Sequence, residues 1–195
     1  MALITDAGSP SIADPGVSAV QVAVGVGATV TAIPGPSAVT MAIGLSGMSG
    51  DRFVFEGFLP RSGIARSERI AAVAAEERTT VVFCAPSRLA SDLADLATRI
   101  PDREVVVCRE MTKLHEEVWR GRLSVAAEEW AIRDVRGEVT IVIAGGDSPE
   151  PDLDAAVALA TAAIEGGERP SSAVKRIAVE TGVSRRALYE AVIGS

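Results

Sequence analysis

Between Asp14 and Asp51 the chain carries 36 consecutive residues without a charged side chain. A stretch of this length and composition must be buried, either in a membrane or in the core of a folded domain. Glycine and proline residues divide it into pieces that are too short to span a bilayer, and no positively charged run stands before it as in a signal peptide. We therefore expect a buried helix–strand–helix in a soluble globular protein.

Short apolar runs alternate with helix-forming segments along most of the chain. Apolar runs that end at glycine or proline predict strands at 2–5, 29–33, 53–57, 79–84, 104–108 and 140–144. Helices are expected at 15–26, 37–46, 61–77 and 88–100, with Ser37 as a cap of the second helix. Such alternation is typical of an α/β fold with mostly parallel sheets. Aromatic residues make up only 4% of the chain, so aliphatic side chains must fill the core.

Changes in composition predict the domain boundaries. From Arg61 the chain becomes charged and alanine-rich, and residues 148–151 have the composition of a linker. We therefore divide the chain into a first α/β lobe (1–59), a second α/β lobe (60–147) and a linker with a helical extension (148–195).

Within the extension, Ala178, Gly182 and Leu188 have the spacing of a helix-turn-helix, with Ser184 capping the second helix. Residues 152–195 carry five basic and six acidic side chains, and the whole chain has a net charge of −7. These balances argue against bulk electrostatic binding of nucleic acid, although a local basic patch is compatible with them. The extension is therefore predicted to be a docking or clamp module rather than the DNA-binding head of a transcription factor.

Two glycine-bearing loops follow predicted strands, at 6–16 and at 34–38. Ligands of parallel sheets bind beyond the carboxyl ends of the strands, so both loops are candidates for one site. A tight turn and a rigid connector capped by Ser37 are equally compatible with these residues. The loops match neither the Walker A nor the dinucleotide fingerprint, and neither carries a basic residue. We therefore expect a ligand without phosphates to neutralise.

A charged segment, 109–117, follows another predicted strand. Its Glu110, Lys113 and His115 are candidate general bases or phosphate ligands, and a solvated charged surface is the alternative. Cys84 and Cys108 are predicted core residues in a reducing cytoplasm. With one histidine and two separated cysteines, the chain has no metal-ligand spacing, and no metal site is predicted.

Six segments, in this order, resemble the tetrapyrrole methylase superfamily, and in particular its ribosomal RNA 2′-O-ribose methyltransferases. They are Thr5-Asp6-Ala7-Gly8-Ser9-Pro10 with Ile12-Ala13-Asp14-Pro15-Gly16, Pro34-Gly35-Pro36-Ser37-Ala38, Phe55-Glu56-Gly57-Phe58-Leu59-Pro60, Ala85-Pro86-Ser87-Arg88, Arg109-Glu110-Met111-Thr112-Lys113-Leu114-His115-Glu116-Glu117, and Gly137-Glu138. The helical extension is similar to that of the family as well. The resemblance implies a two-lobed fold, S-adenosyl-L-methionine as the cofactor, and a homodimer.

The resemblance also implies site residues. The cofactor is expected to contact Asp6, Ala7, Gly8, Ser9, Pro10, Ile12, Ala13, Asp14, Ser37, Ala38, Cys84 and Ala85. The implied substrate is a cytidine ribose in small-subunit (16S) ribosomal RNA, or in the assembled small subunit. Glu110 is the expected base, and Arg61, Arg109 and Lys113 are expected to hold RNA phosphates.

The chain also departs from the family pattern. The family begins with a strand and a Thr-Pro-Ile-Gly-Asn-Leu loop, followed by a Glu-Asp-Thr-Arg segment, and neither is present. We therefore expect the amino-terminal part of the first lobe to be missing. Cys84 and Ser87 replace the Glu and His that are usual in the family. A truncated, non-catalytic family member is one alternative, and a methyltransferase that acts on small molecules of the tetrapyrrole type is another.

Overall fold

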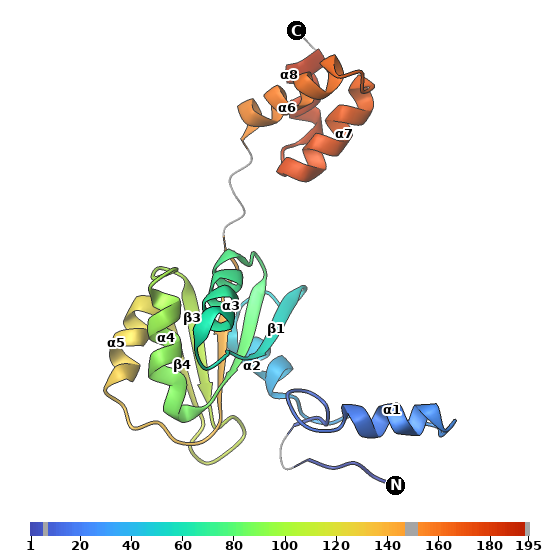
Figure 1. Cartoon of the computed structure of the whole chain (residues 1–195). Coiled ribbons are helices and arrows are strands. Elements are labelled where there is room, and N and C mark those ends of the chain that lie inside the picture. Colours follow the sequence, from blue (N-terminus) through green and yellow to red (C-terminus); the bar gives the residue numbers. More distant parts are fainter. Residues whose placement is uncertain (6–7, 147–151, 194–195) are drawn as a thin grey trace. The chain divides into compact units, whose positions relative to one another are not determined.

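The computed structural model describes residues 1–5, 8–146 and 152–193 (Figure 1). It divides the chain into two compact units, Met1–Gly146 and Asp147–Ser195. The boundary between the units lies next to the predicted start of the helical extension. The predicted division at 59/60 lies inside the first unit, so the two-lobe organisation stays a prediction. No described helix is long and apolar enough to cross a membrane.

The first unit contains a five-stranded sheet with the order β1-β2-β5-β3-β4 (Figure 1). The strands are β1 (Phe53–Phe58), β2 (Thr79–Cys84), β3 (Glu104–Arg109), β4 (Glu117–Arg122) and β5 (Val139–Ile143). Of these, β1 and β2 pair in parallel, whereas β5 is antiparallel to β2 and β3, and β4 is antiparallel to β3. The predicted mostly parallel sheet is therefore wrong. The loop 110–116 joins β3 directly to β4, and so short a connection permits only an antiparallel pair.

Helices cover both faces of this sheet. One face packs against α3 (Gly63–Ala75), α4 (Leu89–Ala97) and α5 (Leu123–Ala131), through buried side chains that include Ile70, Leu93 and Trp130. The other face packs against α2 (Ala38–Ser46), which buries Val39, Ala42 and Ile43. Successive strand residues alternate between the two cores: Val82, Val107 and Ile141 belong to the first, and Val81, Val106 and Val142 to the second.

The first 36 residues contribute no strand to the described part of the sheet. Helix α1 (Val17–Gly25) forms as predicted but buries no residue. The predicted strands at 2–5 and 29–33 are wrong, and Ile4 and Ile33 are exposed. An apolar run becomes a strand only when a neighbour pairs with its backbone and covers its side chains. Neither condition is met for these two runs.

The second unit is a bundle of α6 (Leu153–Glu165), α7 (Pro170–Thr181) and α8 (Arg185–Ile193) with a core of its own. The Asp152 carboxylate caps α6 by accepting a hydrogen bond from the Ala155 N–H at 3.0 Å. Gly182 ends α7 with a left-handed φ of 69°, and the Ser184 hydroxyl accepts the Ala187 N–H at 3.5 Å at the start of α8. The predicted helix-turn-helix is thereby confirmed. The predicted linker at 148–151 lies outside the described residues.

Candidate active site at one edge of the sheet

Several predicted site segments leave the sheet at the same edge. β2 ends at Cys84 and β3 ends at Arg109, while β5 runs the opposite way and begins at Val139, which pairs with both. Cys84–Ala85, the loop after Arg109, and Gly137–Glu138 therefore lie next to one another. We call this the β2–β3 edge.

Helix α2 directs its first turn toward the β2–β3 edge (Figure 1). Its C-terminal end lies at the opposite end of the sheet, because Gly47 lines a pocket with Thr79, where β2 begins. Ser37 and Ala38, at the other end of α2, therefore point back to the edge. Ser37 is the N-cap residue, but its hydroxyl makes no capping hydrogen bond, contrary to prediction. That hydroxyl is available to a ligand.

Glu110 is held by both sides of the edge. Its N–H donates to the Glu138 carbonyl at 2.9 Å, and its Oε1 accepts from the Glu138 N–H at 2.8 Å and from Lys113 Nζ at 2.9 Å. A Cβ at Gly137 would lie 2.3 Å from the Glu110 carboxylate, so the close approach of the Glu110 side chain to this segment requires glycine at position 137. The hydrogen bonds from Lys113 and from the Glu138 amide lower the pKa of Glu110, and the Glu110 carboxylate raises the pKa of Lys113. Glu110 is therefore an ionised, fixed acceptor at neutral pH.

Basic side chains surround the loop that follows β3. Arg109 Nε lies 3.0 Å from Glu117 Oε2, and Arg133 Nη2 lies 2.6 Å from Glu117 Oε1. The Arg133 guanidinium also lies 3.9 Å from the centroid of the Trp130 ring, a cation–π contact. Burial acts to raise the pKa of Glu117, but the two arginines outweigh it and hold this pKa below its usual value.

All three predicted RNA-binding residues lie toward the β2–β3 edge. Arg109 and Lys113 leave β3 there, each with a carboxylate partner. Arg61 follows β1, which runs parallel to β2, and it is exposed. Its carbonyl accepts a hydrogen bond from Arg88 Nη2 at 3.3 Å. Arg109 and Lys113 thus lie on or next to the Glu110 loop, whereas Arg61 follows β1, three positions from β3 in the sheet.

A buried ionic cluster supports Cys84. The Cys84 thiol donates to Asp92 Oδ2 at 3.2 Å, while Asp92 Oδ1 lies 2.9 Å from Arg66 Nη2 and 3.3 Å from Arg88 Nη2. Arg66 Nε also donates to Asp95 Oδ2 at 2.7 Å. Burial and the neighbouring Asp92 carboxylate raise the pKa of Cys84, so its sulfur stays a thiol. The prediction that Cys84 is a core residue is confirmed.

Sequence reasoning missed this cluster. The available signal was Asp92 itself, because it lies on the buried face of α4 together with Leu89, Leu93 and Leu96. A carboxylate at such a position requires a cationic partner. The identity of that partner was not predictable, since Arg66 comes from a separate helix.

The described part of the predicted cofactor loop, residues 8–16, does not follow a strand. Its described hydrogen bonds are internal, from the Ile12 N–H to the Ser9 carbonyl and from the Ser11 N–H to the Pro15 carbonyl, both at 3.4 Å. A Cβ added at Gly8 or Gly35 would meet no atom within 4 Å, so there is open space beside both glycines. The strand 2–5 that was expected to carry this loop to the sheet does not form, and a shared pocket for the two glycine-bearing loops stays a prediction.

The cofactor-site residues thus divide into two groups. Ser37, Ala38, Cys84 and Ala85 lie toward the β2–β3 edge, whereas residues 8–14 lie in the loop just described, with Ile12 48% exposed. Asp6 and Ala7 lie outside the described residues. The role of residues 6–14 stays a prediction.

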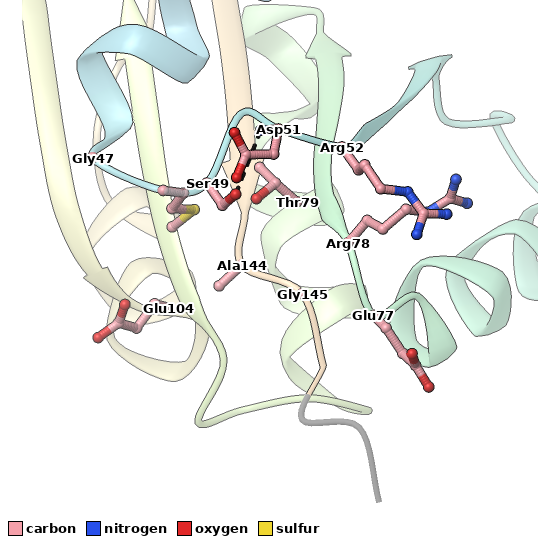
Figure 2. Close-up of a pocket in the computed structure, with 11 residues that line it drawn as sticks. Gly47, Ser49, Asp51, Arg52, Glu77, Arg78, Thr79, Glu104, Ala144 and Gly145 are labelled. Carbon is pink, nitrogen blue, oxygen red and sulfur yellow. Dashed lines mark hydrogen bonds between the residues drawn. The ribbon is translucent and has the colours of Figure 1, made fainter. Parts of the chain in front are cut away.

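A pocket of about 510 Å³ lies at the opposite end of the sheet, where β1 and β2 begin and β5 ends (Figure 2). Figure 2 shows Arg52 and Arg78 on one side of it, and carboxylates on the other sides. Arg78 pairs with Glu76 at 2.7 Å, which holds the pKa of Glu76 at about 2. No predicted site residue lines this pocket. Its charges are mixed, and it gives no support to a second ligand site.

Comparison with known proteins identifies the relatives of this chain. Residues 1–127 match the family model described as Tetrapyrrole (Corrin/Porphyrin) Methylases. A protein of Mycobacterium bovis named Ribosomal RNA small subunit methyltransferase I is 43% identical over 195 residues, which cover 99% of this chain and 68% of the relative. A protein of the same name from Synechocystis is 38% identical over 194 residues, covering 97% of this chain and 70% of the relative.

A solved structure shares the fold. Uroporphyrin-III C-methyl transferase from Thermus thermophilus, complexed with S-adenyl homocysteine, has a TM-score of 0.51 and 21% identity, over 70% of this chain and 62% of that one. The chain thus spans about two thirds of the length of its relatives. The family model covers more than half of the chain, and the segments that carried the resemblance lie in the matched region or shortly after it. The chain belongs to the tetrapyrrole methylase family.

Proposed function

We propose that this chain is the methyltransferase region of an enzyme that uses S-adenosyl-L-methionine to methylate the 2′-hydroxyl of a cytidine in small-subunit ribosomal RNA. The observation that carries the proposal is the 43% identity, over 99% of the chain, to a protein named Ribosomal RNA small subunit methyltransferase I. The aligned region includes the helical unit as well as the sheet unit. The proposed enzyme acts in the cytoplasm as a homodimer.

The donor set at the β2–β3 edge fits the cofactor. Ser37 offers a hydroxyl without a capping partner, and the exposed turn around Gly35 offers open backbone. The segments given to the cofactor carry no basic side chain, which suits an uncharged nucleoside joined to a cationic sulfonium. The loop 6–14 completes the proposed binding site.

When bound, S-adenosyl-L-methionine would supply an electrophilic methyl group for the ribose oxygen, with S-adenosylhomocysteine as the leaving group. The residues of this chain hold the hydroxyl in line and accept its proton. Both side-chain hydrogen bonds of Glu110 use Oε1, which leaves Oε2 for the ribose hydroxyl. A carboxylate with a lowered pKa is a weak base, so Glu110 acts mainly by aligning the hydroxyl and by stabilising the positive charge that develops on it during methyl transfer. Arg61, Arg109 and Lys113 hold the flanking phosphates.

Two measurements test the proposal. Titration calorimetry should show that the full chain binds S-adenosyl-L-methionine, and radiolabelled methyl transfer should label small-subunit rRNA at a cytidine 2′-oxygen. No binding heat at millimolar cofactor would refute an intact site and favour the non-catalytic alternative. Methylation of a tetrapyrrole and not of RNA would favour the small-molecule alternative.

A matched pair of variants tests Glu110. Glu110→Gln should lower kcat by about 10²-fold, the lower end of the range for a positioned proton acceptor, while the cofactor affinity is unchanged. Glu128→Gln, an exposed change on α5, is the control and should leave kcat unaltered. Equal kcat in both variants would remove Glu110 from the mechanism.

A further inference from the structure

Charge is segregated within the helical unit. Residues 152–168 carry only acidic charged side chains: Asp152, Asp154, Glu165 and Glu168. Residues 169–193 carry mostly basic ones: Arg169, Lys175, Arg176, Arg185 and Arg186, against Glu180 and Glu190. The weak net charge of the unit therefore conceals an acidic α6 and a basic α7–α8 pair.

Ion pairs inside the unit neutralise some of the basic side chains. Arg176 lies 2.7 Å from Glu168 and 3.0 Å from Glu180, and Arg186 lies 2.9 Å from Glu190. By contrast, Lys175 and Arg185 are exposed and form no ion pair within residues 152–193. Two cations, one on each helix, are thus available to a partner.

Each of these cations has a large exposed side chain one helical turn further on. Val179 follows Lys175 on α7 and is 81% exposed, and Tyr189 follows Arg185 on α8 and is 45% exposed. Residues four apart lie on the same face of a helix, so each helix presents a cation beside an apolar or aromatic side chain. We use the name α7–α8 surface for these four residues, and each pair is a separate contact point on its own helix. The core of the unit does not use them, since it is built from Val174, Ile177, Leu188 and their neighbours.

We propose that the α7–α8 surface binds the phosphate backbone of ribosomal RNA away from the methylated nucleotide. Unpaired Lys and Arg side chains bind phosphates, and an exposed tyrosine can stack on an unpaired base. A second contact point on a linked unit raises the effective concentration of the RNA at the catalytic unit. The choice of RNA as partner rests on the proposed function.

The experiment measures RNA binding by the full chain without cofactor, using fluorescence anisotropy with a labelled transcript of small-subunit rRNA across a salt series. Lys175→Gln/Arg185→Gln should weaken binding about tenfold and reduce the slope of log K against log salt by about 1.5 to 2, the effect of two lost phosphate contacts. Arg99→Gln/Arg122→Gln is the control, because it removes the same charge from exposed positions of the sheet unit. The control should bind like the unmodified chain.

The outcomes separate the alternatives. Equal weakening in both double variants would overturn the proposal, because binding would then follow total charge. An unchanged salt slope in the first variant would overturn it too, as would tighter binding to duplex DNA than to the RNA. The double variant should still bind S-adenosyl-L-methionine normally. Two results together would separate this proposal from the proposed function. If the unmodified chain binds no cofactor, but Lys175→Gln/Arg185→Gln still weakens RNA binding, the proposed function is refuted and RNA binding by the α7–α8 surface is supported.

Discussion

The cluster under Cys84 leads to a sharp prediction for Asp92→Ala. The Asp92 side chain is 3% exposed and that of its partner Arg66 is 9% exposed, so the substitution leaves a buried guanidinium with half of its counter-charge. Breaking such a pair costs about 3 to 5 kcal/mol. Because Asp95 still pairs with Arg66 at 2.6 Å, we expect the lower limit, about 3 kcal/mol. Asp95→Ala should cost about 1 kcal/mol or less, since the Asp95 side chain is 49% exposed.

The assay is urea unfolding followed by tryptophan fluorescence. Trp119 and Trp130 are the only tryptophans of the chain and both lie in the sheet unit, so the signal reports this unit alone. Arg66→Leu/Asp92→Leu should be less destabilising than Asp92→Ala, because it leaves no unpaired buried charge. If Asp92→Ala costs no more than Asp95→Ala, the argument from burial is refuted.

Three further predictions concern the sheet unit. Gly137→Ala should destabilise it by about 1 to 3 kcal/mol in the same assay, because the φ of 86° at Gly137 is strained for a residue with a side chain and the added methyl overlaps the Glu110 carboxylate; a neutral result would contradict this strain. The pKa of Glu76 is about 2 in the folded chain and ordinarily 4.5. The ion pair of Glu76 therefore stabilises the folded state fully above pH 4.5, and this stabilisation is lost as the pH falls toward 2. Between pH 4.5 and 2, Glu76→Gln should reduce the change of the unfolding free energy with pH by about 1 kcal/mol or less, because the partner Arg78 is partly exposed. An unchanged pH dependence would show that the Glu76–Arg78 pair does not contribute. Burial raises the pKa of Cys108 to about 11 and that of Cys84 further, so a thiol reagent at pH 8 should modify neither until urea unfolds the chain.

The sequence predicted four of the five described strands to within one residue at each end. Three of these strands, β2, β3 and β5, are mostly buried, so their apolar runs are nearly continuous. β4 was missed because it is an edge strand with three charged residues, Glu117, Arg120 and Arg122, and its pairing with β3 comes from the chain reversal before it. The strands at 2–5 and 29–33 were predicted in error, since a local pattern cannot show whether a partner strand exists.

For the site, the family resemblance pointed to Cys84, Glu110 and Gly137, which lie near one another at the β2–β3 edge, while their roles stay predictions. The fixed position of Glu110 was not predictable, because it depends on a hydrogen bond to Glu138 in a segment 28 residues away. The ionic cluster around Asp92 was not predictable for the same reason. Charge partners across elements appear only once the elements are packed.

The helical unit owes its core to its own three helices, and none of the residues in that core comes from the sheet unit. Substitutions on the outside of α7 and α8 therefore leave the stability of the sheet untouched. The outer residues of this unit can therefore change without altering the side chains of either hydrophobic core of the sheet unit.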